Sequence, residues 1–316
     1  MAGGQERALR RRIRTIQSTK KITRAMELIA ASQIVRAQSR IATNRPFREG
    51  MARVVVEAAL GDPEAAAKLL GQPESPRSVA VLAVVSDRGL CGPYNSATLR
   101  TTERLIQDLR SREAEPRIFV VGRRGPPYLR FRGFEVEQSF TGFTDRPTFA
   151  DARRVSAAVS APFVRGEVDQ LLMVSTRFIS AGIQRVQTEQ LLPIPDPTVK
   201  PEEADDAEGS KPVYAGPPVP AIPERQGYTE FEPDVETLLE SLGPRAVESE
   251  IFSALLEGAA AFFTAQQRAM ASATENADDL ITNLTRVMNR ARQDAITTEI
   301  MEIVGGAEAL RQSKGA

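Results

Sequence analysis

The stretch from Ser78 to Val85, SVAVLAVV, is an unbroken apolar run that ends in the polar turn Ser86-Asp87-Arg88-Gly89. Short valine-rich runs bounded by turn residues are typical of strands buried on both faces. A helical pattern follows through Leu109, and a second strand is predicted at Arg117 to Val121. This order of strand, helix and strand predicts a parallel βαβ unit.

The alternation continues toward the C-terminus. Phe149 to Val164 has a helical pattern, and Val168 to Thr176 has the pattern of a strand. Ile183 to Leu192 is predicted to pair with that strand as a hairpin through Ser180-Ala181-Gly182. Residues 77–194 are therefore expected to form a Rossmann-like domain with a mostly parallel sheet.

Long helices are predicted on both sides of this domain. Within residues 1–61, Gln5 to Gly61 is dominated by strong helix formers, and Pro46 is its only proline, where we expect a bend or an interruption. Within residues 233–316, a helix is predicted from about Asp234 to Leu310, with Gly243-Pro244 as a candidate break.

Apolar spacing indicates that the two terminal helices pair. A heptad-like seam with spacings of three and four runs through the C-terminal helix at Ile281, Leu284, Met288, Ala291 and Ala295. The N-terminal helix has two apolar stripes, namely Leu9, Ile13, Ile16 and Ile22, Met26, Ile29. The predicted fold class is an α/β domain inserted between terminal helices that form a long antiparallel coiled coil.

Residues 195–232 differ in composition from the rest of the chain. Eight prolines lie between Pro195 and Pro223, with a cluster of five acidic residues among them. Such a segment cannot bury a core, so we expect an extended loop or insertion.

The residue inventory argues against catalysis. The chain has no histidine and one cysteine, Cys91, which removes the usual general base, thiolate metal clusters and any disulfide within the chain. Neither GxGxxG nor GxxxxGK[ST] occurs. We expect Ser86 to Gly92 to be a structural turn that uses glycine at positive φ, and Cys91 to be a buried small residue. No catalytic, cofactor-binding or metal-binding residue is predicted.

The longest aliphatic run, Val79 to Val85, is too short to span a membrane, and the Arg-rich N-terminus does not resemble a secretion signal. Net charge is zero, but residues 1–48 hold twelve basic residues against Glu6 and Glu27, a balance of +10. This basic stretch has three interpretations: a solvated helical face, a nucleic-acid arm, or a surface for acidic protein loops. The lack of aromatic residues before Phe47 weakens the second.

Two long motifs at opposite ends carry a family resemblance. Arg14 to Glu27 (RTIQSTKKITRAME) with Ala30-Ala31-Ser32, and Ala269 to Ala277 (AMASATENA) with Asn289 to Ile300 (NRARQDAITTEI) and Ile303 to Ala307, closely resemble the signatures of F-type ATP synthase γ subunits. Weaker similarity extends over Ser86 to Asn95, Leu191-Leu192-Pro193 and Phe231 to Asp234.

The resemblance implies a non-catalytic central-stalk rotor without a cofactor. In that family the shaft couples proton-driven rotation of the c ring to conformational cycling of the catalytic β subunits. The implied partners are the hexamer of α and β subunits, the ε subunit and the c ring, with no nucleic acid and no membrane insertion. The implied location is the cytoplasmic face of a bacterial plasma membrane, in the F1 sector.

Site residues follow from the same resemblance. It implies β-subunit contacts at Lys20, Lys21, Arg24, Met26, Arg292, Gln293, Thr297 and Glu299, and c-ring contacts at Phe231 and Glu232. The segment Ala261 to Ala265 (AFFTA) departs from the family, which usually has a Ser-Glu pair there. The acidic loop lies where chloroplast relatives have a redox-switched insertion, but it contains no cysteine.

Two other classes of function remain as alternatives. One is a nucleotide-binding enzyme built on the α/β domain, and the other is a basic coiled coil that binds nucleic acid. The polar face at Arg292 to Glu299 has its own alternative, an ordinary exposed helical face.

Overall fold

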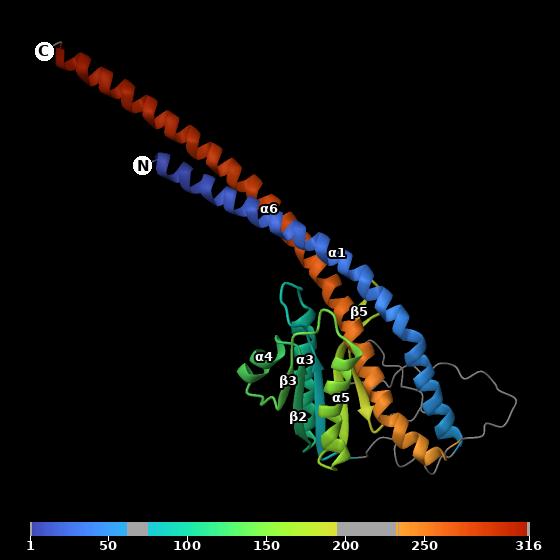
Figure 1. Ribbon diagram of the computed structural model, residues 1–316. Coiled ribbons are helices and arrows are strands. Elements are labelled where there is room, and N and C mark those ends of the chain that lie inside the picture. Colours follow the sequence, from blue (N-terminus) through green and yellow to red (C-terminus); the bar gives the residue numbers. More distant parts are fainter. Residues whose placement is uncertain (1, 62–74, 195–231, 233, 315–316) are drawn as a thin grey trace. The chain divides into compact units, whose positions relative to one another are not determined.

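The computed structural model in Figure 1 describes residues 2–61, 75–194, 232 and 234–314. The elements in chain order are α1 (Ala2–Gly61), β1 (Ser78–Val84), α3 (Tyr94–Ser111), β2 (Glu115–Val121), α4 (Gly125–Phe131), β3 (Gln138–Phe140), α5 (Phe149–Val164), β4 (Gln170–Phe178), β5 (Gln184–Leu192) and α6 (Val235–Lys314). The chain divides into two compact units, one of Ala30–Gln266 and the other of Met1–Ile29 with Gln267–Ala316. Both α1 and α6 contribute to both units.

A five-stranded sheet forms the centre of the Ala30–Gln266 unit, with the strand order β3-β2-β1-β4-β5. Strands β1, β2, β3 and β4 are parallel, whereas β5 is antiparallel to β4. The order 3-2-1-4 is that of a Rossmann-type sheet, which confirms the predicted mostly parallel domain. The β4–β5 hairpin is also confirmed.

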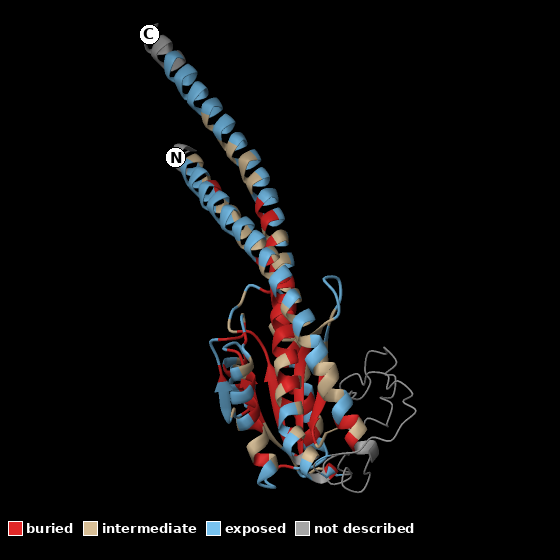
Figure 2. Cartoon of the chain, turned by 45° about the vertical axis from the view of Figure 1, so that its right-hand side comes forward, coloured by how far each residue is buried: buried red, intermediate tan, exposed pale blue. Residues whose placement is uncertain are grey.

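Side chains that alternate along β1 explain why helices cover both faces of the sheet. Val79 and Val81 pack in a buried cluster with Leu105 of α3. Leu82 points to the opposite face and packs in a cluster that includes Ile251 of α6 and residues of α5. Strand β1 is accordingly buried from Val79 to Val84 and β4 from Gln170 to Thr176, and Figure 2 shows the centre of the sheet in red.

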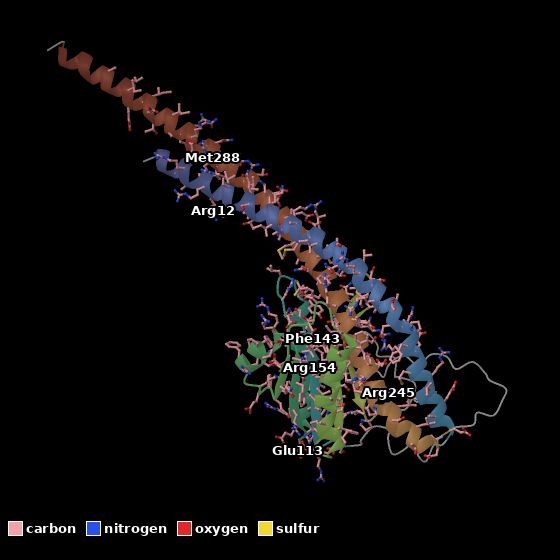
Figure 3. All side chains as sticks on the ribbon, in the orientation of Figure 1. Arg12, Glu113, Phe143, Arg154, Arg245 and Met288 are labelled. Atoms are coloured by element: carbon pink, nitrogen blue, oxygen red, sulfur yellow. The ribbon has the colours of Figure 1, made fainter. Side chains whose placement is uncertain are left out.

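The start of α5 is fixed by local polar contacts. Thr148 and Asp151 form a capping box, in which each side chain accepts a hydrogen bond from the other residue's backbone N–H. One turn later, the Arg154 guanidinium lies 5.3 Å from the centroid of the Phe143 ring (Figure 3). This cation–π contact holds the segment after β3 against α5.

Three details differ from the sequence expectations. At Pro46 a bend or an interruption was expected, and the interruption is wrong because α1 continues through the proline, while the bend stays a prediction. The candidate break at Gly243-Pro244 is also wrong, because α6 continues through it. The short elements α4 and β3 were not predicted, and β2 begins two residues before the predicted start. Residues 195–231 lie outside the described residues, so the predicted loop character of that segment stays a prediction.

None of the helices in the described ranges combines the length and the apolar character that crossing a membrane requires.

Candidate functional site

The carboxyl end of the parallel strands is where Rossmann-type sheets bind nucleotides, and here that edge is occupied by internal hydrogen bonds. The Asp87 carboxylate accepts hydrogen bonds from the backbone N–H groups of Arg123, Gly142 and Thr144, at 3.0, 2.8 and 3.2 Å. Asn95 Oδ1 accepts the backbone N–H of Ser86 at 2.9 Å. The backbone N–H groups of Ser86, Arg123, Gly142 and Thr144 are therefore already used by the protein's own side chains.

Helix α6 closes the same edge with large side chains. Phe262 is 2% exposed, and its ring lies 6.0 Å from that of Tyr94 in an edge-on arrangement. The cavity lined by Ser86, Tyr94 and Phe262 has a volume of about 10 Å³, room for one water molecule at most. Ligand pockets are tens of times larger, which argues against the nucleotide-binding alternative.

The turn after β1 agrees in part with the sequence prediction. Gly92 has a φ of 53°, as expected of a glycine in a tight turn, but Leu90 also adopts a positive φ, of 62°, and Gly89 does not. Cys91 is buried, as predicted, and burial raises the pKa of its thiol, so the protonated, unreactive form is favoured.

The helix pair lies in the other unit, and two contacts define its register. The Lys20 ammonium forms an ion pair with Asp278, and the hydroxyls of Thr23 and Thr274 lie 2.8 Å apart. From Lys20 to Thr23 the residue number in α1 rises by three, whereas from Asp278 to Thr274 the residue number in α6 falls by four. The two helices are therefore antiparallel. A polar pair in the seam favours one register over its neighbours.

Side-chain burial follows this register closely. Along α6, Met270, Thr274 and Ala277 are buried, and the five predicted seam residues from Ile281 to Ala295 are half-buried. Met288, labelled in Figure 3, is one of these five. Leu9, Ile13 and Ile16 face the seam from α1. The predicted antiparallel coiled coil is confirmed.

Within this unit, α6 extends beyond the first residues of α1. In the register set by Lys20 and Asp278, the first residues of α1 lie level with about residue 296 of α6. Every residue from 296 to 307 is exposed, as the pale blue end of α6 in Figure 2 shows. At 1.5 Å per residue, residues 297–314 extend about 26 Å beyond α1.

This overhang, residues 297–314, has many apolar side chains. Ile300, Met301, Ile303 and Val304 are 54 to 68% exposed. Contiguous apolar surface of this kind on a helix indicates a binding surface. Within the described residues, nothing in this chain covers it.

The predicted residues of α6 meet this surface. Gln293 and Thr297 share one face, opposite the seam, and Ile300 and Val304 continue that face at helical spacing. Arg292 and Glu299 lie on the adjacent face, near the seam. All four predicted side chains are exposed.

The predicted residues of α1 are in mixed surroundings. Lys21 and Arg24 are exposed, and Arg24 pairs with Glu27 at 2.9 Å. Lys20 pairs with Asp278, and Met26 is half-buried. The second predicted stripe is not a seam, because Ile22 and Ile29 are 58% and 59% exposed.

Comparisons with known proteins decide which family this arrangement belongs to. The family model described as ATP synthase matches residues 5–310. A protein of Frankia casuarinae named ATP synthase gamma chain is 46% identical over 97% of this chain and 98% of its own length. Proteins of the same name from Parafrankia sp. and Streptomyces coelicolor are 44% and 41% identical, over 97 to 98% of each chain. The chain belongs to the ATP synthase γ chain family.

Solved structures agree with this fold. A chain of the Euglena gracilis mitochondrial ATP synthase matches with a TM-score of 0.65 and 16% identity, covering 99% of this chain and 97% of that one. A chain from the central stalk and c ring of the Tetrahymena thermophila enzyme matches with a TM-score of 0.58 and 21% identity, over 80% and 99%. At these identities the likeness concerns the fold.

Family membership makes this chain a non-catalytic rotor subunit in the central stalk of F-type ATP synthase, associated peripherally with a membrane complex. The recognition from the terminal motifs is confirmed, as are the fold class and the rotor function.

The remaining predicted contacts, Phe231 and Glu232, precede α6 in the sequence. Phe231 is outside the described residues. Glu232 is exposed, and it precedes Asp234, whose carboxylate accepts the backbone N–H of Thr237 at 2.9 Å and caps the helix.

The apolar overhang of this chain was not identified from the sequence as a functional feature. Its signal was present, because the predicted helix extends past the end of the heptad seam at Ala295. When the heptad seam ends before the helix ends, the rest of the helix either binds another partner or has none.

Proposed function

We propose that the overhang and the adjoining helix pair are the surfaces through which this rotor acts on the β subunits of a hexamer of alternating α and β subunits. The observation that carries the proposal is the exposed face of Gln293, Thr297, Ile300 and Val304. Gln293 and Thr297 offer hydrogen-bonding groups, and Ile300 and Val304 offer apolar surface nearer the end of α6. This order suits a partner with an apolar lining around the end of α6 and polar loops around the residues before it.

Charge supports the same partner for α1. Residues 1–48 have a balance of +10, and Lys21 and Arg24 are exposed in the helix pair. A basic helix attracts acidic segments of another protein over a distance of about one Debye length, roughly 8 to 10 Å. We assign Lys20, Lys21, Arg24 and Met26 to the contact with acidic β-subunit segments.

Coupling then follows from differential binding. A shaft built of two different helices presents a different side to each β subunit, so each rotation step stabilises a different conformation in each. A rotor can shift a conformational equilibrium only by the difference in its contacts with the two states. Arg292, Gln293, Thr297 and Glu299 would supply the polar part of that difference.

For the Ala30–Gln266 unit, we propose that Phe231 and Glu232 contact polar loops of the c ring and that the α/β domain binds the ε subunit. Glu232 is exposed next to the capped start of α6. In a bacterial host this arrangement would lie on the cytoplasmic face of the plasma membrane.

The test is a paired substitution in the reconstituted complex. Gln293→Ala with Thr297→Ala should lower ATP-driven proton pumping about thirtyfold, because each of the two lost hydrogen bonds is worth about 1 kcal/mol and about 1.4 kcal/mol corresponds to a factor of ten. Gln138→Ala with Thr141→Ala makes the same two changes at exposed positions of the α/β domain and should leave pumping unchanged. Equal pumping by both variants would remove Gln293 and Thr297 from the coupling surface.

Assembly is the complementary measurement. The tagged chain, expressed in its host, should copurify with the α and β subunits. A chain that folds but is recovered without them would contradict the whole proposal.

A further inference from the structure

A buried group of charged side chains joins α1 and α6 to the β4–β5 hairpin within the Ala30–Gln266 unit. The Arg48 guanidinium of α1 binds the Glu250 carboxylate of α6, with Nε 3.0 Å from each oxygen and one Nη 2.7 Å from Oε2. Its other Nη lies 3.5 Å from Glu257 Oε1. These three side chains are 11 to 15% exposed. Arg48 therefore fastens α1 to two successive turns of α6.

Glu257 connects the same group to the sheet. Its second carboxylate oxygen accepts the backbone N–H of Phe178, at the end of β4, at 3.1 Å. Arg177 of β4 is close enough to act electrostatically on both Glu257 and Glu189. The clasp, as we call Arg48, Arg177, Glu189, Glu250 and Glu257, thus spans four elements.

Glu189 of β5 is the most deeply buried member, at 3% exposure. Its carboxylate accepts a hydrogen bond from Gln187 Nε2 at 2.6 Å. Within the described part of the chain, no guanidinium donates to it. Its neighbours in charge are Arg48 from α1, Arg177 from β4, and Glu250 and Glu257 from α6. Arg185, further along β5 on the same side, is exposed.

The charges of the clasp do not balance when every group is ionised. Three carboxylates face two guanidiniums, which leaves one negative charge in a site from which water is largely excluded. An uncompensated buried charge is costly, and a carboxyl group in that position takes up a proton instead. Burial, together with the nearby Glu250, raises the pKa of Glu189 to about 7, and burial also raises the pKa of Glu257.

We propose that protonation of Glu189 controls how firmly the clasp holds its elements together. With one proton on Glu189, the clasp binds α1 and α6 to the β4–β5 hairpin. Loss of that proton weakens the packing of α1 against the sheet. This is a property of the folded rotor, independent of which partners it contacts.

The direction of the effect follows from proton linkage. A carboxyl group whose pKa is higher in the folded state is protonated there while the unfolded chain is ionised, so the folded state is favoured at low pH. That stability is fully present below about pH 4.5 and is lost as pH rises through about 7. Between about pH 6 and about pH 8 the unfolding equilibrium constant should rise about tenfold.

The composition simplifies the interpretation of a stability change between about pH 6 and about pH 8. The chain has no histidine, so the side chain that ordinarily titrates between pH 6 and 8 is absent. A stability change in this range therefore reports on perturbed groups such as Glu189 and on the α-amino terminus.

The experiment is urea unfolding of the full chain at about pH 6 and about pH 8. The wild type should show the tenfold rise, and Glu189→Gln, which mimics the protonated carboxyl, should lose most of it. Glu49→Gln, the same change at a 45% exposed side chain of α1, should keep the full rise. The proposal is overturned if Glu189→Gln and the wild type depend on pH equally.

A second measurement does not depend on any variant folding. Hydrogen exchange of the wild-type chain, corrected for the intrinsic pH dependence of amide exchange, should show faster opening at about pH 8 in peptides covering residues 40–58 and 184–192 than in those covering α3. Equal changes in all these peptides would show that proton loss does not act through the clasp.

Discussion

Phe262 belongs to the segment Ala261 to Ala265, which the sequence analysis sets apart from the γ-subunit pattern, and its ring is packed in the core of the Ala30–Gln266 unit. Its ring lies 5.3 Å from that of Phe263 and 6.0 Å from that of Tyr94. Ile34 of α1 and Cys91 belong to the same buried cluster. Two adjacent aromatic rings thus fill the end of the sheet, where smaller and more polar residues would leave space.

Replacing the Phe262 ring should destabilise the folded chain strongly. Phe262→Ala is expected to lower the free energy of unfolding by about 3 to 5 kcal/mol, because it removes a buried ring and leaves a cavity. Phe131→Ala makes the same change at a side chain that is 85% exposed and should cost well under about 1 kcal/mol. Urea unfolding of both variants is the measurement, and similar losses would contradict the assignment of Phe262 to the core.

Gly122 and Gly133 both have a positive φ, but only at Gly122 would a Cβ also collide with neighbouring atoms. A Cβ on Gly122, at φ +103°, would lie 2.3 Å from the Val85 carbonyl oxygen, whereas a Cβ on Gly133, at φ +81°, would meet nothing within 4 Å. Gly133→Ala should therefore cost only the strain of the backbone, about 1 to 2 kcal/mol. Gly122→Ala should cost clearly more, or prevent folding, as measured by thermal unfolding. Equal melting temperatures would contradict the close approach of β1 and β2 at this turn.

Single residues were predictable from sequence where the reason was local. The burial of Cys91 followed from the absence of any residue to activate it. The clasp could not be predicted, because Arg48 and Glu250 lie 202 residues apart and neither belongs to a motif.

Among the elements, α1 shows how tertiary contacts override local propensity. Proline within a helix removes one hydrogen bond and costs about 3 kcal/mol. On the residues directly after Pro46, however, Phe47 packs edge-on against Phe149 at 6.2 Å, and Arg48 binds Glu250. These contacts hold the helix across the proline, and the helix passes through it unbroken.

Pro46→Ala should consequently stabilise the protein. Alanine restores the missing backbone hydrogen bond without disturbing the neighbouring contacts, since residue 46 is exposed. We expect a gain of about 1 to 2 kcal/mol in the free energy of unfolding, part of the helix gain being offset because alanine gives the unfolded chain more freedom. Arg45→Ala, one residue earlier and 76% exposed in its side chain, should change it by less than about 0.5 kcal/mol. A destabilised Pro46→Ala would mean that the proline itself shapes α1.

Strong periodicity made the large elements predictable. The seam from Ile281 to Ala295 repeats in heptads, and the SVAVLAVV run is apolar throughout, so both elements follow from pattern alone. In contrast, β3 has three residues and α4 has seven, which is too short for any period to appear. The fit of Gln293 and Thr297 to a partner stays a prediction, because their role lies in a surface outside this chain.

For the whole molecule, the division into two units predicts that shaft contacts and stability can be separated. Deleting residues 297–314 removes the overhang but leaves the seam and the Lys20–Asp278 pair. Circular dichroism and thermal unfolding should therefore show a folded chain with an unchanged midpoint, while ATP synthesis in the reconstituted complex falls.

A longer deletion provides the comparison. Removing residues 276–314 also takes away Asp278 and the seam from Ile281 onward, so α1 should lose its partner and become sensitive to proteases between residues 2 and 20. If the shorter deletion already exposes this part of α1, the register given by Lys20 and Asp278 is wrong.

The register of the helix pair also decides when the shaft can form during synthesis. Thr23 meets Thr274, 251 residues later in the chain, whereas the β1–β2 unit closes within a few tens of residues. At about 5 to 20 residues per second, the ribosome needs more than ten seconds to supply the partner of α1. Throughout that delay the aliphatic residues of α1 that face α6 in the folded chain lack this partner, so the helix pair can form only after the rest of the chain has been made.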